Sequence, residues 1–214
     1  MDCCLFLRLD PVIPDQLLFT SIFLSSTLDI EKKDMAMEEF EVFIKGKLIN
    51  LVVITRSLAQ NSAWYTWFND EETTGGMQQH YFPNTRELQV AFFESEINNY
   101  PNKLQLGIVV TETNLLIGMI SLSQIDRQNQ KCEIGGLIGE KKYRKMEYWI
   151  EANEMLINHA FNTLNLNRIY GGSIAREVHQ FYVRVLGFED EGISKSDVFR
   201  KGTFVDAYRF AKLR

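Results

Sequence analysis

The sequence predicts a mixed α/β fold, in which helices cover both faces of a central mixed sheet. Short β-branched runs typical of strands alternate with helical segments from about residue 48 onward. The expected order is strand, two helices, three strands, helix, strand, helix and two strands, an order that favours helices on both faces of one sheet. The 214 residues, 45% hydrophobic and 24% charged, suit an ordinary soluble protein of about one domain.

The first expected strand is the β-branched run Leu48–Ile54, and a helix is predicted over Leu58–Phe68. This helix is rich in aromatic residues. Trp64 and Phe68 are expected to pack mainly in the core, with the wall of a substrate cleft as the alternative.

A second helix is predicted over Thr85–Asn98, because Thr85 is a good N-cap and apolar residues recur along one side. The pattern then changes to strands, at Leu104–Thr111, Leu115–Gln124 and Cys132–Ile138. The apolar side of the helix consists of Leu88, Phe92, Phe93 and Ile97.

The strongest helical pattern is Ile150–Leu164, where apolar residues recur every four positions. A short strand at Arg168–Ile174 follows, and then a helix over Glu177–Leu186 that ends at Gly187. A pair of strands is expected to close the chain, at Phe188–Ile193 and Phe204–Phe210. These strands could pair with a second copy, so a homodimer is possible.

The first 40 residues differ from the rest, so we expect an N-terminal extension of unclear role before a domain at residues 41–214. The apolar run Leu17–Leu28 is too short to span a bilayer, and no basic front end or cleavage site marks a secretory signal. Met35 and Met37 are plausible alternative starts, because regular patterning begins just after them. No membrane partner is expected.

The totals exclude several classes of function. A net charge of −5 with one local basic cluster argues against a nucleic-acid partner. Three cysteines make no disulfide framework and three scattered histidines make no metal motif, so we expect a cytoplasmic protein without a metal. Cys132, in a predicted strand, is expected to be a small buried side chain.

The stretch Ile134–Ala152 combines an apolar strand, a basic loop and the start of a helix. Backbone N–H groups and the helix dipole converge at such a corner and favour a phosphate. Four cations crowd it, although a solvated charged surface explains the run about equally well: Lys141, Lys142, Arg144 and Lys145.

Four separated stretches resemble the GNAT superfamily of N-acetyltransferases, and within it the RimJ/RimL-like branch. They are WFND at 67–70, EIGGLIGEKKYR at 133–144 with Glu151–Ala152, HAFNTLNLNRI at 159–169 and VLGFEDEG at 185–192. The resemblance covers about Val42 to Leu213. It implies a GNAT-type sheet and acetyl transfer from acetyl-CoA to a primary amine, either on a small molecule such as an amino-sugar nucleotide or at a protein N-terminus.

The resemblance also implies roles for individual residues. Backbone groups of three residues would pair with the pantetheine arm of acetyl-CoA: Leu137, Ile138 and Gly139. Further cofactor contacts are expected at Lys142, Arg144, Lys145, Met146, Glu147, Tyr148 and Arg176. The acceptor amine is expected near Trp67, Asn69 and Ser121.

Two residues are expected in catalysis. Glu133 begins the cofactor-facing strand and is the candidate general base, although a half-exposed strand carboxylate is an equal alternative. Tyr182 lies one residue before the position where many members carry a general-acid tyrosine, which Val183 occupies here. Ser121 and Ser123 could hold a relay water, but the polar face of a strand is the more common explanation.

The cofactor loop departs from the family pattern. Glu147 and Trp149 replace small residues that let the backbone approach a pyrophosphate, and Arg176 replaces an asparagine. A carboxylate there would repel the ligand, and an indole would fill its space. The alternative function is therefore a non-catalytic binding or scaffold module with the same fold.

Overall fold

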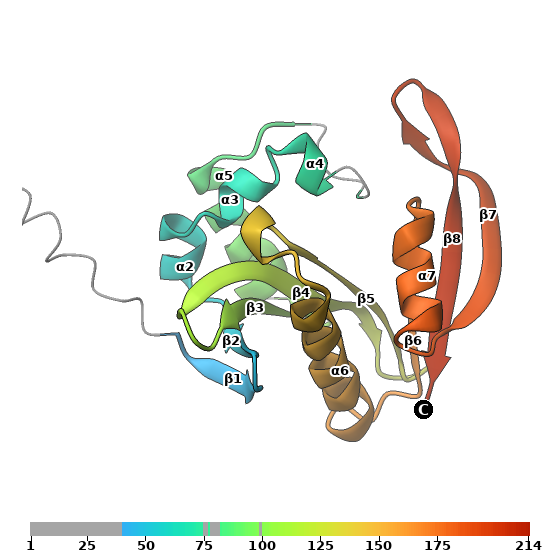
Figure 1. Cartoon of the computed structure of the whole chain (residues 1–214), viewed down its shortest axis with the longest axis horizontal. Helices are drawn as coiled ribbons and strands as arrows, with labels where there is room; N and C mark the ends of the chain where they lie inside the picture. Colours follow the sequence, from blue (N-terminus) through green and yellow to red (C-terminus); the bar gives the residue numbers. More distant parts are fainter. Residues whose placement is uncertain (1–39, 75–76, 78–81, 99) are drawn as a thin grey trace, which may run out of the picture. The chain divides into compact units, whose positions relative to one another are not determined.

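A computed structural model of the chain describes residues 40–74, 77, 82–98 and 100–214. These residues form an eight-stranded mixed sheet in the order β1-β2-β3-β4-β5-β6-β8-β7 (Figure 1). All described pairs of strands are antiparallel except β5 with β6. The strands are β1 (Val42–Lys45), β2 (Ile49–Val53), β3 (Leu104–Val110), β4 (Leu115–Asp126), β5 (Lys131–Ile138), β6 (Arg168–Ser173), β7 (Glu189–Arg200) and β8 (Thr203–Leu213).

Helices cover both faces of the sheet, as the sequence predicts. One hydrophobic core joins the sheet to α6 and α7, and a second joins the opposite face to the helices before β3. The helices are α2 (Arg56–Asn61), α3 (Trp64–Trp67), α4 (Glu71–Thr74), α5 (Arg86–Phe92), the π-helical continuation η1 (Phe93–Asn98), the 3-10 turn η2 (Lys141–Tyr143), α6 (Met146–Asn162) and α7 (Arg176–Arg184).

Alternation along the strands divides side chains between the two cores. On β4, Ile120 packs towards α6 whereas its neighbour Met119 packs towards the early helices. Trp64 and Cys132 are fully buried, which confirms their expected packing. Leu88 was expected on the apolar side of its helix but is 53% exposed, because the helix turns that position outward.

The sheet opens between its two parallel strands. β5 pairs with β6 only from Lys131 opposite Arg168 to Glu133 opposite Tyr170, whereas β5 stays paired with β4 as far as Ile138. The C-terminal half of β5 therefore leaves β6 at an angle, and the two ribbons diverge in Figure 1. This divergence positions the site.

Several element boundaries differ from those predicted. The expected helix 58–68 is two helices, because Ser62 adopts an extended backbone and its hydroxyl accepts from the N–H of Trp64. Helix α6 begins at Met146, four residues earlier than expected, and β1 and α4 were not predicted. Strands β7 and β8 are longer than predicted because Lys201 and Gly202 form their turn at positive φ.

The expected N-terminal extension, including Leu17–Leu28, Met35 and Met37, lies outside the described residues apart from position 40. Among the described helices, none is both long and apolar enough to cross a bilayer.

Candidate functional site

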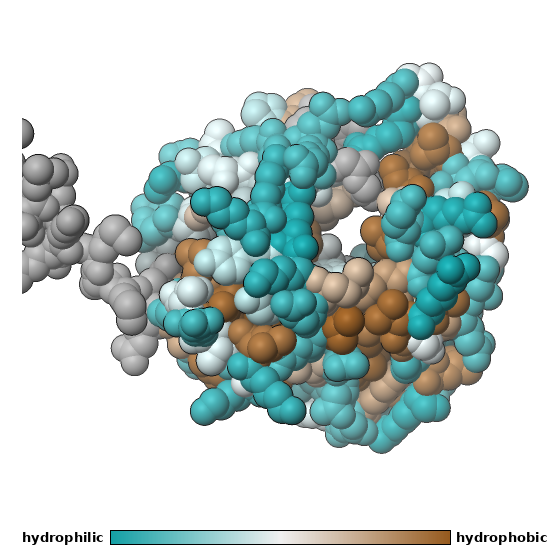
Figure 2. Space-filling model, viewed as in Figure 1, coloured by the Kyte–Doolittle hydropathy of each residue, from teal (hydrophilic) through white to brown (hydrophobic). Residues whose placement is uncertain are grey.

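A cavity of about 710 Å³ lies where β5 and β6 diverge. Residues 134–138 of β5 line one side, and Gly172, Ser173 and Ile174 line the other. The space-filling view is hollowed, with apolar surface below and to the right of the hollow and hydrophilic surface on its left (Figure 2). The cavity reaches both faces of the sheet, because residues of both hydrophobic cores contribute to its wall.

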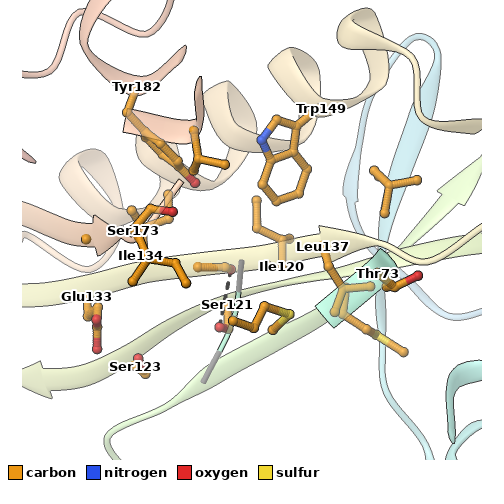
Figure 3. Close-up of a pocket in the computed structure, with 18 of the residues that line it drawn as sticks. Thr73, Ile120, Ser121, Ser123, Glu133, Ile134, Leu137, Trp149, Ser173 and Tyr182 are labelled. Atoms are coloured by element: carbon orange, nitrogen blue, oxygen red, sulfur yellow. Dashed lines mark hydrogen bonds between the residues drawn. The ribbon is translucent and has the colours of Figure 1, made fainter. Parts of the chain in front are cut away.

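On the α6 side, Trp149 and Tyr182 project towards the cavity (Figure 3). The indole lies over β5, and a β-carbon added to Gly136 would come within 2.9 Å of its Cη2 atom. Trp149 therefore occupies part of the space above the strand. The sequence predicts that this indole fills space needed by a pyrophosphate, and that role stays a prediction.

Tyr182 is held by packing and by one buried hydrogen bond. Its ring stacks on Phe210 with centroids 4.3 Å apart, and its hydroxyl donates to Asn153 Oδ1 at 3.0 Å. Burial raises the pKa of Tyr182 above its usual value, so the hydroxyl stays protonated at neutral pH. It lies on the opposite side of the sheet from Glu133 (Figure 3).

The other side of the sheet presents polar residues. Glu133 lies opposite Ser123 on β4 and opposite Tyr170 on β6. Burial, reinforced by the charge of Glu133, raises the pKa of the Tyr170 hydroxyl. Ser121 Oγ donates to the backbone oxygen of Gly135 at 3.4 Å (Figure 3). A carboxylate and three hydroxyls thus flank the point where the strands separate.

Two of the four loop cations are engaged by acidic residues near α4. Lys141 Nζ lies 3.1 Å from Asp70 Oδ1 and 2.8 Å from Glu72 Oε2, and Arg144 Nη1 lies 2.7 Å from Glu72 Oε1. Hydrogen bonds from Thr73, followed by Lys141, lower the pKa of Asp70 to about 2. The basic corner is therefore an ion-pair network rather than four free cations.

The N-terminus of α6 faces the cavity. Lys145 is the N-cap but makes no side-chain hydrogen bond there, and both it and Met146 line the cavity. The first-turn N–H groups and the positive end of the dipole are available to an anion. At the other edge of the sheet, Glu151 fixes α6 by accepting backbone hydrogen bonds from the β1–β2 turn.

Eight of the predicted site residues line the cavity: Leu137, Ile138, Arg144, Lys145, Met146, Glu133, Tyr182 and Ser121. The others do not line it. The N–H of Gly139 donates to Ile117 O at 2.8 Å, so it is not free for a ligand. Arg176, Lys142 and Glu147 are exposed, and Tyr148 packs on the ring of Tyr143.

The expected acceptor contacts Trp67 and Asn69 have structural partners. The indole of Trp67 lies against Gly139 and donates to Glu140 Oε1 at 3.0 Å. The side chain of Asn69 bonds both backbone groups of Asn84. Phe68, between them, lines the cavity instead.

The sequence reasoning missed Lys103 and Gln105, which line the cavity ahead of and within β3. A signal was present, because both alternate with Leu104 and Leu106. It also missed Glu72, whose adjacency to WFND could have marked it as a partner for the basic loop.

The comparisons with known proteins agree with this architecture. A family model described as an acetyltransferase (GNAT) domain matches residues 53–177. The uncharacterized N-acetyltransferase p20 of Bacillus licheniformis is 32% identical over 111 residues, 51% of this chain and 62% of that protein. The putative ribosomal N-acetyltransferase YdaF of Bacillus subtilis (strain 168) is 31% identical over 114 residues, 53% and 61% respectively.

The chain thus spans about three-fifths of the length of these curated relatives. Among solved structures, microcin C7 self immunity acetyltransferase MccE, in complex with acetyl-CoA and AMP, shares the fold with a TM-score of 0.69 at 20% identity. That match covers 79% of this chain and 94% of the other. Because the family model covers more than half of the sequence, the chain belongs to the GNAT acetyltransferase family.

Proposed function

We propose that this protein transfers an acetyl group from acetyl-CoA to a primary amine. The observation that carries the proposal is the edge of β5 from Ile134 to Ile138, which faces a cavity instead of pairing with β6. An extended pantetheine arm can hydrogen-bond to such an edge as an added strand. Family membership supports the same reaction.

The chain's own groups suit the two ends of the coenzyme. Backbone groups of Leu137 would hold the pantetheine arm, and the α6 N-terminus with Lys145 would receive the pyrophosphate. The bound coenzyme would supply the acetyl thioester. Arg144 contributes less than the sequence suggests, because Glu72 already neutralises it.

Glu133 is the proposed general base. Its carboxylate would take the proton from the ammonium of the acceptor, directly or through a water held by Ser121 and Ser123. The freed nitrogen would form a bond to the acetyl carbon as the carbon–sulfur bond breaks, and the proton that the new amide nitrogen loses would pass to the leaving thiolate. Free N–H groups on β5 would stabilise the negative charge on the acetyl oxygen.

The acceptor is proposed to be a small-molecule amine, such as an amino-sugar nucleotide, or a protein N-terminus. The second choice follows the RimJ/RimL-like resemblance and the name of one relative. We further propose that residues 41–214 form the working domain, that the protein acts in the cytoplasm, and that the exposed β7 edge is where a second copy would pair.

A second candidate is a binding module without catalysis. Two observations favour it: Trp149 fills space above Gly136, and Glu72 pairs with two of the four loop cations. Both would weaken coenzyme binding.

An acetylation screen separates the two candidates. Purified protein is incubated with acetyl-CoA and a panel of amines and peptides, and thiol release and acetylated product are measured. Transfer is expected in the wild type, and Glu133→Gln should slow turnover by about 100-fold or more. Glu154→Gln, on the exposed face of α6, is the control and should retain activity. No transfer to any acceptor, together with no detectable binding of acetyl-CoA, would favour the binding module.

A further inference from the structure

A row of polar side chains crosses three strands beside the opening of the sheet. Ser123 lies opposite Glu133, and Leu122 lies opposite Leu104. Lys103 directly precedes Leu104, so it falls beside Ser123 in the same row. Neighbouring strands are about 4.8 Å apart, which places the backbones of Lys103 and Glu133 about 10 Å apart.

The row continues as a polar patch. In the next row on the same face, closer to the early helices, Gln105 lies opposite Ser121. Both residues line the cavity. The following row holds Met119 and Leu137, which those helices bury. This face is therefore apolar where helices cover it and polar where the cavity begins, which is typical of a surface that binds a polar ligand.

Lys103 is partly buried in this patch. Its Nζ lies 4.6 Å from the ring centroid of Phe92, and both residues line the cavity. Burial lowers the pKa of Lys103, and the charge of Glu96 opposes that effect only in part. A bound anion would restore the stability of the ammonium form.

Two other cavity cations already have counter-ions, and Lys145, at the N-terminus of α6, is assigned above to the coenzyme. Arg144 pairs with Glu72, and Arg209 Nη2 lies 2.5 Å from Asp197 Oδ2. Lys103 forms no ion pair within the described part of the chain, although it lines the same cavity as Glu133. One positive and one negative group thus face an acceptor across a single row.

Building on the proposed transfer reaction, we propose that the acceptor is an amine that also carries an anionic group, a carboxylate or a phosphate. Lys103 binds that group, and Glu133 receives the amine at the other end of the row. The two groups of the acceptor lie within about 10 Å of each other, which is the spacing of the row. Polyamines are disfavoured, because their second ammonium would lie next to Lys103.

Four probes of matched length test this class: δ-aminovalerate, aminobutylphosphonate, pentylamine and cadaverine. They share a reacting primary amine and differ in the far group, which is a carboxylate, a phosphonate, a methyl or an ammonium. We expect kcat/KM for the better anionic probe to exceed that for pentylamine by at least tenfold, with cadaverine lowest. The two anionic probes distinguish a carboxylate site from a phosphate site.

Charge variants assign the effect to one residue. Lys103→Met should raise KM for the anionic probes and bring all four within about threefold, without changing KM for acetyl-CoA. Lys103→Glu should make cadaverine the best of the four. Lys45→Met, an exposed lysine of β1, is the matched control and should leave the ranking unchanged.

Binding measurements separate this inference from the reaction on which it rests. If acetyl-CoA binds and the wild type uses the four probes equally, or Lys103→Met keeps the ranking, the inference is overturned and the proposed function stands. If acetyl-CoA does not bind, the proposed function fails. Saturation-transfer NMR then tests the anion site at Lys103. If the wild type binds the anionic probes preferentially and Lys103→Met abolishes that preference, the anion site is supported. Any other result overturns the anion site.

Discussion

Arg144 Nη1 donates to Glu72 Oε1 across 2.7 Å and so joins the loop before α6 to helix α4. Arg144 also donates from Nε to the carbonyl of Ile138, at the end of β5. The side chain expected to bind a diphosphate therefore connects α4 to the end of β5. Glu72 competes with any anion for the same guanidinium.

Neutralising Glu72 should strengthen coenzyme binding. In Glu72→Gln, Arg144 and Lys141 each lose one carboxylate partner and become available to a diphosphate, so we expect the Kd for acetyl-CoA to fall about three- to tenfold. Calorimetry at low salt measures the change, which should shrink at high salt because the charges are exposed. Glu71→Gln, the neighbouring residue of α4, is the control. Weaker binding in Glu72→Gln would mean that Glu72 positions Arg144 productively.

Removing the indole of Trp149 should tighten binding while lowering stability. Trp149→Ala opens the space above Gly136 and also deletes packing against the α6 core, which we expect to cost about 2–3 kcal/mol of unfolding free energy. Denaturant unfolding and calorimetry measure the two effects separately. Tyr148→Ala, outside the cavity, should not improve affinity. An unchanged Kd in Trp149→Ala would show that the indole leaves the coenzyme path clear.

The Tyr182 hydroxyl should matter more for stability than for chemistry. Tyr182→Phe keeps the stacked ring but leaves the buried Asn153 amide oxygen without its donor, which should cost about 1–2 kcal/mol of unfolding free energy. We expect the turnover rate to stay within about threefold of the wild type, with the same pH profile. If turnover instead fell by about two orders of magnitude at unchanged stability, Tyr182 would be identified as a general acid.

Acid should weaken the ion pairs beside α4. The pKa of Asp70 is about 2 in the folded protein and 3.8 ordinarily, so its stabilising effect is complete above about pH 4 and is lost as pH falls towards 2. Asp70→Asn should lower the melting temperature at pH 7, and the difference from the wild type should vanish near pH 2. Glu154→Gln provides the comparison. A difference in melting temperature between Asp70→Asn and the wild type that stays constant across this pH range would contradict the lowered pKa of Asp70.

The sequence predicted the mixed sheet and most of its elements because strand and helix periodicities are local properties. It predicted a site at β5 and the loop before α6, and residues of both line the cavity. It could not foresee that the N–H of Gly139 bonds to Ile117, nor that Trp67 packs beneath that glycine, because both contacts join residues far apart in the chain. The partners of the basic loop were missed for the same reason.

Lys103 shows the limit most clearly. Its alternation with apolar neighbours indicates a face of a strand, but the row it shares with Ser123 and Glu133 depends on the register of three strands. Register is fixed by pairing and turns that the sequence does not state.

The most direct test is a calorimetric titration of the wild-type protein with acetyl-CoA. If the open edge of β5 and the α6 N-terminus hold the coenzyme, binding should be micromolar with one site per chain. Absence of heat up to millimolar acetyl-CoA, with the protein folded throughout, would contradict coenzyme binding at this opening.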